Sequence, residues 1–555
     1  MLSRAHAVFA LAVSLTLFLP APARALSPEG VEAWRADLAF AADSLPRAHA
    51  RFFHTLSPEE YRQELDQLSA RLPALEHHEV VVELARIIVR VGDGHSRVTF
   101  PFDRAAGFVT GHTTTAAPKV PGLVFRHFPV RFGLFGDSLW VIRTDEAHRA
   151  LLGGRVVRLG KGTAGEAIRA VEPVVQRDNE NGVRNLLPTW LVCPEVLAAR
   201  GVIADLERLE LEVEDASGRR RTGTFAPADT GRAVTWIEAR PPAVAARWRL
   251  DRSPERAHWF EILPDQKAVY GRILLVRDQG PQTLARFADS LLAAFESSHA
   301  RRLVLDLRGN DGGDGTLRLP LLTRLIRSRA TTEPGALWTL IDRGTFSAAV
   351  MTAADLEKWT PAIFAGEMTG GDPNSYGDSR RTVLPRSGIT VRLSTLYWQD
   401  SDPRDRRRGI TPHLPVVLTF DDWRNGRDPV LEAALAGGFP AAASTSRHWA
   451  GTAAYTWGRY PLTITLAEPG AAGDGTIDLP AFGHPNRALV SGALADGILR
   501  ASWVADGETW RLEAVPATPA GGRAPRLVGT IAFNGRLVPV VLEARDSAES
   551  PAGAR

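Results

Sequence analysis

The stretch RRLVLDLRGNDGGDG, residues 301–315, is the strongest indication of the fold class of this chain. It begins as a buried apolar strand and then turns through a loop that contains Gly309, Gly312, Gly313 and Gly315. Glycines allow positive φ angles and let the backbone come close to a ligand. In open α/β sheets, ligands bind at the carboxyl ends of the strands. The stretch therefore predicts an α/β core with a ligand-binding or anion-binding loop, although a plain glycine-rich turn is the alternative.

The segments on both sides of this stretch continue an alternation of strands and helices. An apolar strand (267–276), an amphipathic helix (281–295) and the strand 301–307 form a βαβ unit, which implies parallel strands. Next come a helix (316–327), a strand (336–342), a helix from Ser347, a strand (362–367) and a hairpin (382–398). We therefore expect residues 251–436 to form an α/β core with a mixed sheet.

The remaining sequence divides into five segments. Residues 1–25 have a positive start, an apolar run and a small-residue cleavage site, which predicts a signal peptide cleaved after Ala25. Residues 26–110 form a helical N-terminal region and residues 111–250 a β-rich region. Residues 437–447 form a Gly/Ala/Ser/Pro linker. Residues 448–555 contain Asp-Gly and Asn-Gly turns between alternating runs, which predicts an antiparallel β domain.

Composition limits the partners and the location of the protein. The net charge is 66 − 63 = +3, so nothing favours a nucleic-acid partner. A single cysteine, Cys193, cannot form an internal disulfide. An exported chain without disulfides is typical of a bacterial periplasm or exterior, so we expect a periplasmic or secreted protein with no integral membrane segment after signal cleavage. His77, His78 and Glu79 diverge around a helix, and we expect neither metal nor cofactor.

Ser347 in the stretch GTFSAAV, residues 344–350, is a candidate nucleophile. It follows a strand and a short turn and opens an apolar helix. Such a serine is often only an N-cap, whose hydroxyl accepts a hydrogen bond from the first helical turn. The same placement exposes the hydroxyl and points the amide of Ala348 at a reaction centre. The second glycine of the G-x-S-x-G elbow is absent, so this stretch alone leaves both alternatives open.

Five stretches in order, LDLRGNDGG, GTFSAA, AIFAGEMTGG, RRGITPHLPV and DPVLEAAL, resemble the tail-specific (C-terminal processing) serine protease family. The resemblance covers residues 255–436 best. It implies that Ser347 is the nucleophile and that the oxyanion hole is formed by the amides of Ala348 and of Gly312 or Gly313. It also implies that the β-rich region contains a degenerate PDZ-like peptide-binding module.

The general base must differ from the lysine that many members of this family use. Asp372 stands at that position, which excludes a Ser-Lys dyad. The stretch VGDGHSRV is similar to that of the tricorn-like branch, whose base is a histidine, and this implies His95. By spacing, Asp405 and then Asp402 would orient His95, with Glu367 and Asp372 as fallbacks. Ion pairs with the neighbouring arginines are the alternative for Asp405 and Asp402.

These observations predict a secreted serine peptidase that cleaves peptide bonds by Ser-His-Asp acyl-enzyme chemistry. Its substrate, a peptide or protein, would bind as an extended strand. One alternative is a catalytically inactive relative that binds a ligand or a protein, as the retinoid-binding protein of the retina does. The absence of glutamate at Val350 and of lysine at Asp372 favours that alternative. An esterase with the same triad is the third possibility.

Overall fold

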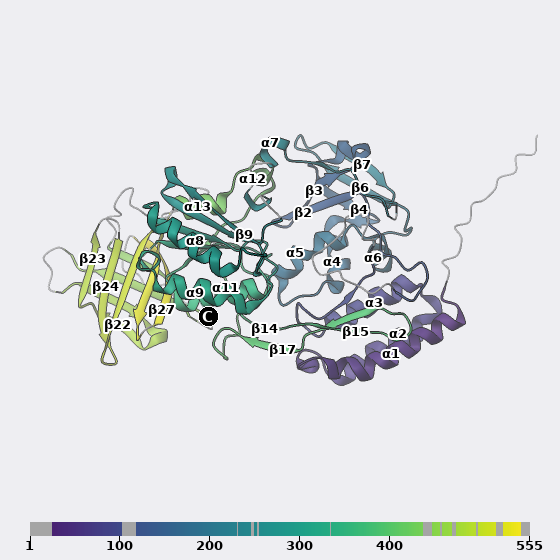
Figure 1. The fold of residues 1–555 in the computed structure, drawn as a ribbon, viewed down its shortest axis with the longest axis horizontal. Coiled ribbons are helices and arrows are strands. Elements are labelled where there is room, and N and C mark those ends of the chain that lie inside the picture. The colour runs from purple at the N-terminus through teal and green to yellow at the C-terminus, as the bar shows by residue number, and fades with distance from the viewer. Residues whose placement is uncertain are drawn as a thin grey trace, which may run out of the picture.

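A computed structural model describes most of the chain: residues 25–102, 118–229, 231–245, 249–251, 255–333, 335–436, 447–455, 458–468, 473–495, 498–517, 526–534 and 536–545. The molecule is elongated, with the C-terminal sheet at one end, the α/β core in the middle and the N-terminal helices at the other end (Figure 1). The expected signal peptide, apart from Ala25, and the expected linker, apart from Arg447, lie outside the described residues. The predicted turn at 496–497 also lies outside them.

The α/β core is organised around a six-stranded sheet of order β18-β13-β12-β11-β10-β9. Only the edge pair β9–β10 is antiparallel, while the other pairs are parallel. The core strands and helices are β9 (His258–Leu263), β10 (Ala268–Ile273), α8 (Leu284–Ser297), β11 (Arg302–Asp306), α9 (Arg318–Arg327), α10 (Arg329–Thr332), β12 (Leu337–Ile341), α11 (Ala348–Trp359), β13 (Ile363–Gly366), β18 (Leu414–Pro415), α12 (Phe420–Asn425) and α13 (Pro429–Ala436).

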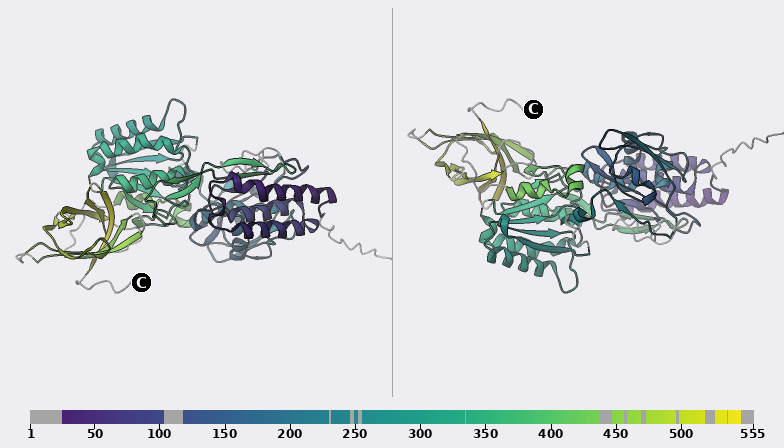
Figure 2. Two further views of the ribbon diagram at one scale, coloured as in Figure 1. Left: turned by 90° about the horizontal axis from the view of Figure 1, so that it is seen from below. Right: turned by 90° about the horizontal axis from the view of Figure 1, so that it is seen from above.

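Side chains of the central strands alternate between two hydrophobic layers, as the period of a strand requires. On one face, Leu303 and Leu305 of β11 pack with α8, α9 and α11. On the other face, Val304 packs with α13 and with Val515 of the C-terminal domain. Figure 2 shows the helices stacked along one side of this sheet. The helix expected from Pro281 begins at Leu284 instead, because the hydroxyl of Thr283 caps its first turn.

The hairpin expected at residues 382–398 does not stay with the core. Together with the residues before it, this segment forms an arm of four short strands. They are β14 (Asn374–Gly377), β15 (Arg380–Val383), β16 (Thr390–Leu393) and β17 (Leu396–Gln399). In this arm β15 pairs with β16, and β14 pairs with β17. Strand β16 also pairs antiparallel with β1 (Arg97–Thr99), so the arm joins the α/β core to the N-terminal region.

The N-terminal region packs its helices against this arm. The helices are α1 (Pro28–Ala48), α2 (Pro58–Arg71) and α3 (His77–Val89). The carboxylate of Asp37 on α1 accepts hydrogen bonds from the amides of Arg386 and Ser387, both at 2.8 Å. Val391 and Leu393 of β16 are fully buried in the same apolar cluster as these helices. Helix α3 therefore ends close to the arm, and the chain after it runs directly into β1.

The β-rich region forms a sheet of order β2-β3-β4-β6-β7, with β5 and β8 at its margins. Its elements are β2 (Val130–Phe135), β3 (Ser138–Thr144), β4 (Arg155–Leu159), β5 (Gly162–Thr163), α4 (Ala164–Val171), α5 (Glu180–Trp190), α6 (Pro194–Ala199), β6 (Leu209–Glu214), β7 (Arg220–Phe225), β8 (Ile237–Glu238) and α7 (Pro242–Ala245). The Nδ2 atom of Asn179, which caps α5, donates to the carbonyls of Thr369 and Arg408 in the core. Whether this sheet is a PDZ-like module stays a prediction.

The C-terminal domain is a curved antiparallel sheet of order β22-β21-β20-β19-β27-β26-β25-β24-β23 (Figures 1 and 2). Its strands are β19 (His448–Tyr455), β20 (Gly458–Leu466), β21 (Gly475–Leu479), β22 (His484–Ala488), β23 (Ser491–Ala495), β24 (Ile498–Ala505), β25 (Glu508–Ala517), β26 (Arg526–Phe533) and β27 (Arg536–Arg545). The predicted Asp506-Gly507 turn joins β24 to β25 with both residues at positive φ. In the described part of the chain, no helix has both the length and the apolarity needed to cross a membrane.

Candidate active site

Ser347 lies in a strained turn between β12 and α11. Its φ and ψ angles are 54° and −127°, a backbone conformation that residues other than glycine rarely adopt. An N-cap residue has an extended backbone and a side chain that accepts an amide of the first turn. Ser347 has neither property, since its side chain makes no capping hydrogen bond. The N-cap interpretation is therefore wrong, and the hydroxyl is free for another partner.

The glycine loop after β11 lies directly against Ser347. A Cβ atom on Gly312 would lie 2.6 Å from Cβ of Ser347 and 2.8 Å from the amide nitrogen of Ala348, so only glycine fits there. The amide of Gly312 donates to Oδ1 of Asn310 at 2.8 Å, which removes it as a free donor. The amides of Ala348 and Gly313 donate to no acceptor among the described residues. Of the expected oxyanion donors, these two remain available.

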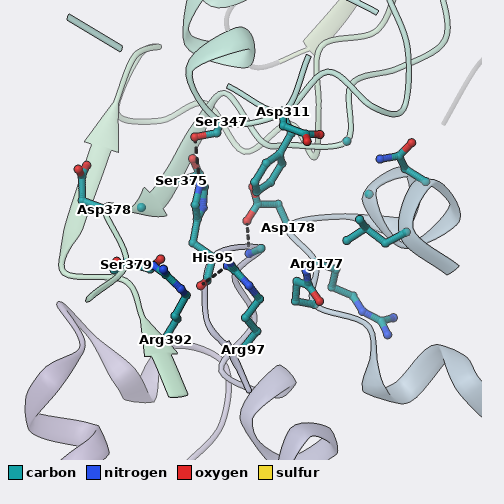
Figure 3. Close-up of a pocket in the computed structure, with 18 of the residues that line it drawn as sticks. His95, Arg97, Arg177, Asp178, Asp311, Ser347, Ser375, Asp378, Ser379 and Arg392 are labelled. Atoms are coloured by element: carbon teal, nitrogen blue, oxygen red, sulfur yellow. Dashed lines mark hydrogen bonds between the residues drawn. The ribbon is translucent and has the colours of Figure 1, made fainter. Parts of the chain in front are cut away.

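His95 reaches Ser347 from a segment 252 residues earlier in the chain. Its Nε2 atom lies 3.0 Å from Oγ of Ser347, and the dashed line in Figure 3 marks this contact. The imidazole stacks on the ring of Phe346 with centroids 4.6 Å apart. A Cβ atom on Gly94 would lie 2.7 Å from that ring, so the residue before His95 must be small. The structure thus brings together the two predicted site residues, Ser347 and His95.

Asp93 holds the main chain around His95 in place. Its Oδ1 atom accepts hydrogen bonds from the amides of His95 at 3.0 Å and Ser96 at 2.8 Å, and from the hydroxyl of Ser394 at 2.7 Å. Its Oδ2 atom lies 3.0 Å from Nε2 of His49. Burial raises the pKa of Asp93, but the hydrogen bonds from His49, Ser394 and Ser96 outweigh this and bring it to about 2. Asp93 is therefore ionised at neutral pH.

Burial keeps the His95 imidazole neutral. It lowers the pKa of His95 to about 4, although the charge of Asp93 acts in the opposite direction. The charge of Arg97 lowers this pKa further. Nδ1 of His95 is buried, and a backbone hydrogen bond with Tyr376 also raises the pKa of the ring. At neutral pH the ring can therefore accept a proton at Nε2, provided that Nδ1 carries the ring hydrogen.

Neither carboxylate predicted to orient His95 does so. Asp405 is buried, but it accepts hydrogen bonds from the hydroxyl of Ser401 at 2.6 Å and from Nη2 of Arg407 at 2.8 Å. Asp402 forms an ion pair with Arg404 at 3.1 Å. Both therefore have the ion-pair role that was the alternative, and the spacing argument failed because neighbouring arginines bind both carboxylates.

The two fallback carboxylates also have other partners. Glu367 lies 3.2 Å from Arg343. Asp372, which occupies the position of the family lysine, lies 3.0 Å from Arg408 and accepts a hydrogen bond from Asn179. Burial raises the pKa of Asp372 to about 6. In the described residues, no carboxylate makes a hydrogen bond to the His95 ring.

Asp178 is a site residue that sequence reasoning missed. Its Oδ1 atom accepts the amide of Gly94 at 2.7 Å, which fixes the residue before His95 (Figure 3). Burial, together with the charge of Asp372, raises the pKa of Asp178 well above the ordinary range of a carboxyl group. Nothing in the stretch RDNENG around it indicates a site. Asp93, also missed, lies within the recognised stretch VGDGHSRV and could have been found there.

Ser347 and His95 open into a cavity of about 1020 Å³. Its lining combines arginines and aspartates with apolar side chains that include Phe100, Trp190 and Trp398. Strand β1 contributes three consecutive lining residues and is an edge strand of its small sheet. A cleft of this size and mixed lining can accommodate several residues of an extended chain.

Comparisons with solved structures find distant likenesses. Mature CPAF is 13% identical, with 73% of this chain and 96% of that chain covered and a TM-score of 0.49. Mature CPAF complexed with lactacystin is also 13% identical, with 71% and 96% covered and a TM-score of 0.48. The photosystem II D1 C-terminal processing protease is 14% identical, with 69% and 92% covered and a TM-score of 0.33. No protein-family model and no curated protein matches the sequence. Likeness at this level does not establish an activity.

Proposed function

We propose that this protein is a serine peptidase in which Ser347 is the nucleophile and His95 the general base. The observation that carries the proposal is the 3.0 Å contact between Oγ of Ser347 and Nε2 of His95. A serine hydroxyl is a weak nucleophile until an adjacent base accepts its proton. The strained backbone of Ser347 and the absence of a capping bond support the same role, because such strain gathers at functional sites.

In this mechanism the neutral His95 removes the proton from Oγ while Oγ attacks the carbonyl carbon of the scissile bond. The amides of Ala348 and Gly313 then donate to the oxyanion of the tetrahedral intermediate. His95 returns its proton to the leaving amine, which leaves an acyl group on Ser347. A water molecule, deprotonated by His95, attacks the acyl carbon. The bond between that carbon and Oγ of Ser347 then breaks, His95 returns the proton to Oγ, and the second product leaves.

The imidazolium that forms in each step needs stabilisation, and within the part of the chain that the structure describes no carboxylate hydrogen-bonds to Nδ1. The charges of Asp93 and Asp378 both raise the pKa of His95, which means that both favour its protonated form. Asp93 also holds the His95 amide, so its position is fixed while the proton moves. We therefore assign Asp93 a positioning and electrostatic role in place of Asp405.

A fluorophosphonate probe tests the nucleophile directly. We expect the wild-type protein to be labelled and Ser347→Ala not to be labelled. Ser375→Ala is the matched control, since Ser375 lines the same cavity and should leave labelling unchanged. His95→Ala should slow labelling by about a hundredfold or more, in line with the loss of a general base.

Three outcomes contradict the proposal. An unlabelled wild-type protein would favour the non-catalytic binding alternative. Full labelling of Ser347→Ala would place the nucleophile elsewhere. Full labelling and cleavage by His95→Ala would identify another base. Comparison of a peptide with its matched ester then separates a peptidase from an esterase, because only a peptidase cleaves the amide bond at a comparable rate.

A further inference from the structure

Three arginines form a row across the small sheet beside the candidate active site. Arg97 on β1 lies opposite Arg392 on β16, and Arg392 lies opposite Arg381 on β15. Directly opposed residues in an antiparallel sheet point to the same face. Arg97 and Arg392 line the cavity that contains Ser347 and His95. Figure 3 shows both of them beyond His95, on the side away from Ser347.

Of the arginines in this row, Arg97 and Arg392 line the cavity, and neither has a carboxylate partner among the described residues. Arg97 donates one hydrogen bond, from Nη1 to the carbonyl of His95 at 3.0 Å. Arg392 donates one, from Nη1 to the carbonyl of Ser379 at 3.3 Å. Nε of Arg392 is buried and makes no hydrogen bond within the described chain. Neither guanidinium forms an ion pair with any carboxylate that the structure describes.

The nearby acidic groups are engaged elsewhere. Asp93 attracts Arg97 through its charge, but its oxygens accept hydrogen bonds from His49, His95, Ser96 and Ser394. Asp378, which also lines the cavity, accepts a hydrogen bond from Nε1 of Trp398. Asp311 is on the Ser347 side of the cleft in Figure 3. The arginine pair is therefore not neutralised by the protein itself.

Another arginine in this protein shows what a structural role requires. Arg308 is buried in the core and donates to Asp306 at 2.7 Å and to Asp428 at 2.8 Å. By contrast, Arg97 and Arg392 oppose each other as like charges, an arrangement that destabilises a sheet. Burial and the charge of Arg392 lower the pKa of Arg97 to about 10. The pair is costly to the free protein, so an anion that binds there would remove an unfavourable interaction.

We propose that Arg97 and Arg392 form a carboxylate-binding subsite of the cleft, which selects peptides that present a carboxylate to it. This inference rests on the proposed peptidase function and adds the substrate class. A guanidinium binds a carboxylate through paired N–H donors, and both of these side chains line the cavity while donating one hydrogen bond each, to a main-chain carbonyl. The carboxylate belongs either to an aspartate or glutamate side chain or to the C-terminus of the peptide.

A binding measurement tests the subsite independently of catalysis. Fluorescent decapeptides of alanine, serine and leucine are titrated into Ser347→Ala protein, and anisotropy gives the dissociation constants. One set carries a single glutamate at successive positions and an amidated C-terminus, and a second replaces that glutamate by glutamine. A third has no acidic residue but a free C-terminal carboxylate, and a fourth is fully neutral.

We expect one carboxylate-bearing set to bind on the order of tenfold more tightly than its neutral counterpart. Arg392→Gln in the Ser347→Ala background should abolish that preference, and Arg392→Lys should restore only part of it, because lysine lacks the planar fork. Arg177→Gln is the matched control, since Arg177 lines the same cavity but already pairs with Glu172 at 2.9 Å. The Arg177→Gln variant should keep the preference for the carboxylate-bearing peptides. Thermal unfolding should show Arg392→Gln to be at least as stable as its parent.

The outcomes separate the subsite from the proposed function. Preference for internal glutamate assigns the carboxylate to a side chain, and preference for the free C-terminus assigns it to the chain end. Equal affinity for charged and neutral peptides overturns the subsite, whatever the fluorophosphonate result. A preference that survives Arg392→Gln also overturns it. Carboxylate preference in a protein that the probe does not label supports the subsite while refuting the peptidase.

Discussion

The two halves of the candidate active site are built in different ways. On the serine side, Ser347, Ala348 and the glycine loop belong to one α/β core, and the amide of Phe346 bonds the carbonyl of Asn310 within it. On the histidine side, His95 depends on contacts between distant segments. Asp93 reaches Ser394, 301 positions away, and Gly94 reaches Asp178, 84 positions away.

The serine side can therefore form as soon as the core folds, whereas the histidine side needs three regions of the chain to dock. A strained turn supported by neighbouring residues is a local feature. A histidine held by hydrogen bonds to other regions is only as well placed as those regions are. Substitutions of the residues that hold His95 should therefore alter activity through docking, while substitutions of Ser347 or of His95 itself should act through chemistry.

The largest loss of activity is expected when Ser347 and His95 are replaced, singly and together. Ser347→Ala and His95→Ala should each lower kcat/KM by about 10⁴-fold, and the double variant should be no worse than either single one. Residues that act as one unit show this non-additivity, because the second loss removes nothing that still functions. Steady-state cleavage of a peptide substrate by the three variants measures the cycle. If the double variant instead loses the product of the two single fold-losses in kcat/KM, the two residues act independently.

A smaller effect is expected at Asp178, which acts only through the His95 loop. Asp178→Ala leaves the buried amide of Gly94 without an acceptor and should cost about 1–3 kcal/mol of unfolding free energy. The displaced loop should also lower kcat by roughly tenfold, since small misplacements of catalytic groups slow reactions. Asp178→Asn is the matched control: it keeps an oxygen acceptor and resembles the protonated acid that burial favours.

Urea unfolding and peptide cleavage measure both quantities for the Asp178 variants. We expect the asparagine variant to stay close to wild type in kcat and in unfolding free energy. If Asp178→Asn loses as much activity as Asp178→Ala, the negative charge itself matters and the positioning role is wrong. If neither variant changes kcat, the Gly94 contact does not control where His95 lies.

The smallest effect concerns pH. The folded pKa of His95 is lowered to about 4, so the base is neutral at pH 7 and becomes protonated only as the pH falls through that value. The acidic limb of kcat/KM should therefore have its midpoint near pH 4, well below the ordinary histidine pKa of about 6.5. A midpoint near 6.5 would show that the ring is more solvated or better paired than its buried position indicates.

Stability should follow the same ionisation. His95 and His413, whose pKa burial lowers to about 3, bind fewer protons in the folded than in the unfolded state below pH 6.5. Unfolding free energy should thus decrease as the pH falls from about 6.5 towards 4. Urea unfolding at pH 7 and pH 5 measures this slope, and His95→Gln should reduce it.

Much of the core could be predicted from the sequence, because its signals are local. Apolar strands, an amphipathic helix and a glycine loop follow each other within residues 267–315, and the structure contains β10, α8 and β11 there. Residues 382–398 were predicted to form a hairpin, but the sequence did not predict which part of the molecule this hairpin would pack against. Nothing local indicates that β16 pairs with β1, since strand pairing between distant segments depends on how whole regions pack.

The residues of the candidate active site also fall into two groups, those that the sequence could indicate and those that it could not. Ser347 and His95 were recognisable from short stretches, as were the glycines beside them. The orienting carboxylates were not, because spacing along a loop does not determine where a side chain points. Asp405 and Asp402 are held by arginines only a few residues away in the chain. Asp178 has no motif of its own, and only the packing of its segment against Gly94 reveals it.

The linear sequence was enough to identify the strands and helices of the core, the glycine loop, and a serine and a histidine that could form a site. Periodicity and turn residues act over a few positions, so they can be recognised in a linear chain. The folded arrangement brings these two groups together, lets Asp93 and Asp178 hold the histidine, and places Arg97 and Arg392 at the cleft without a carboxylate partner among the described residues. Hydrogen bonds and charge pairs between segments hundreds of residues apart depend on the folded arrangement, which no local pattern encodes.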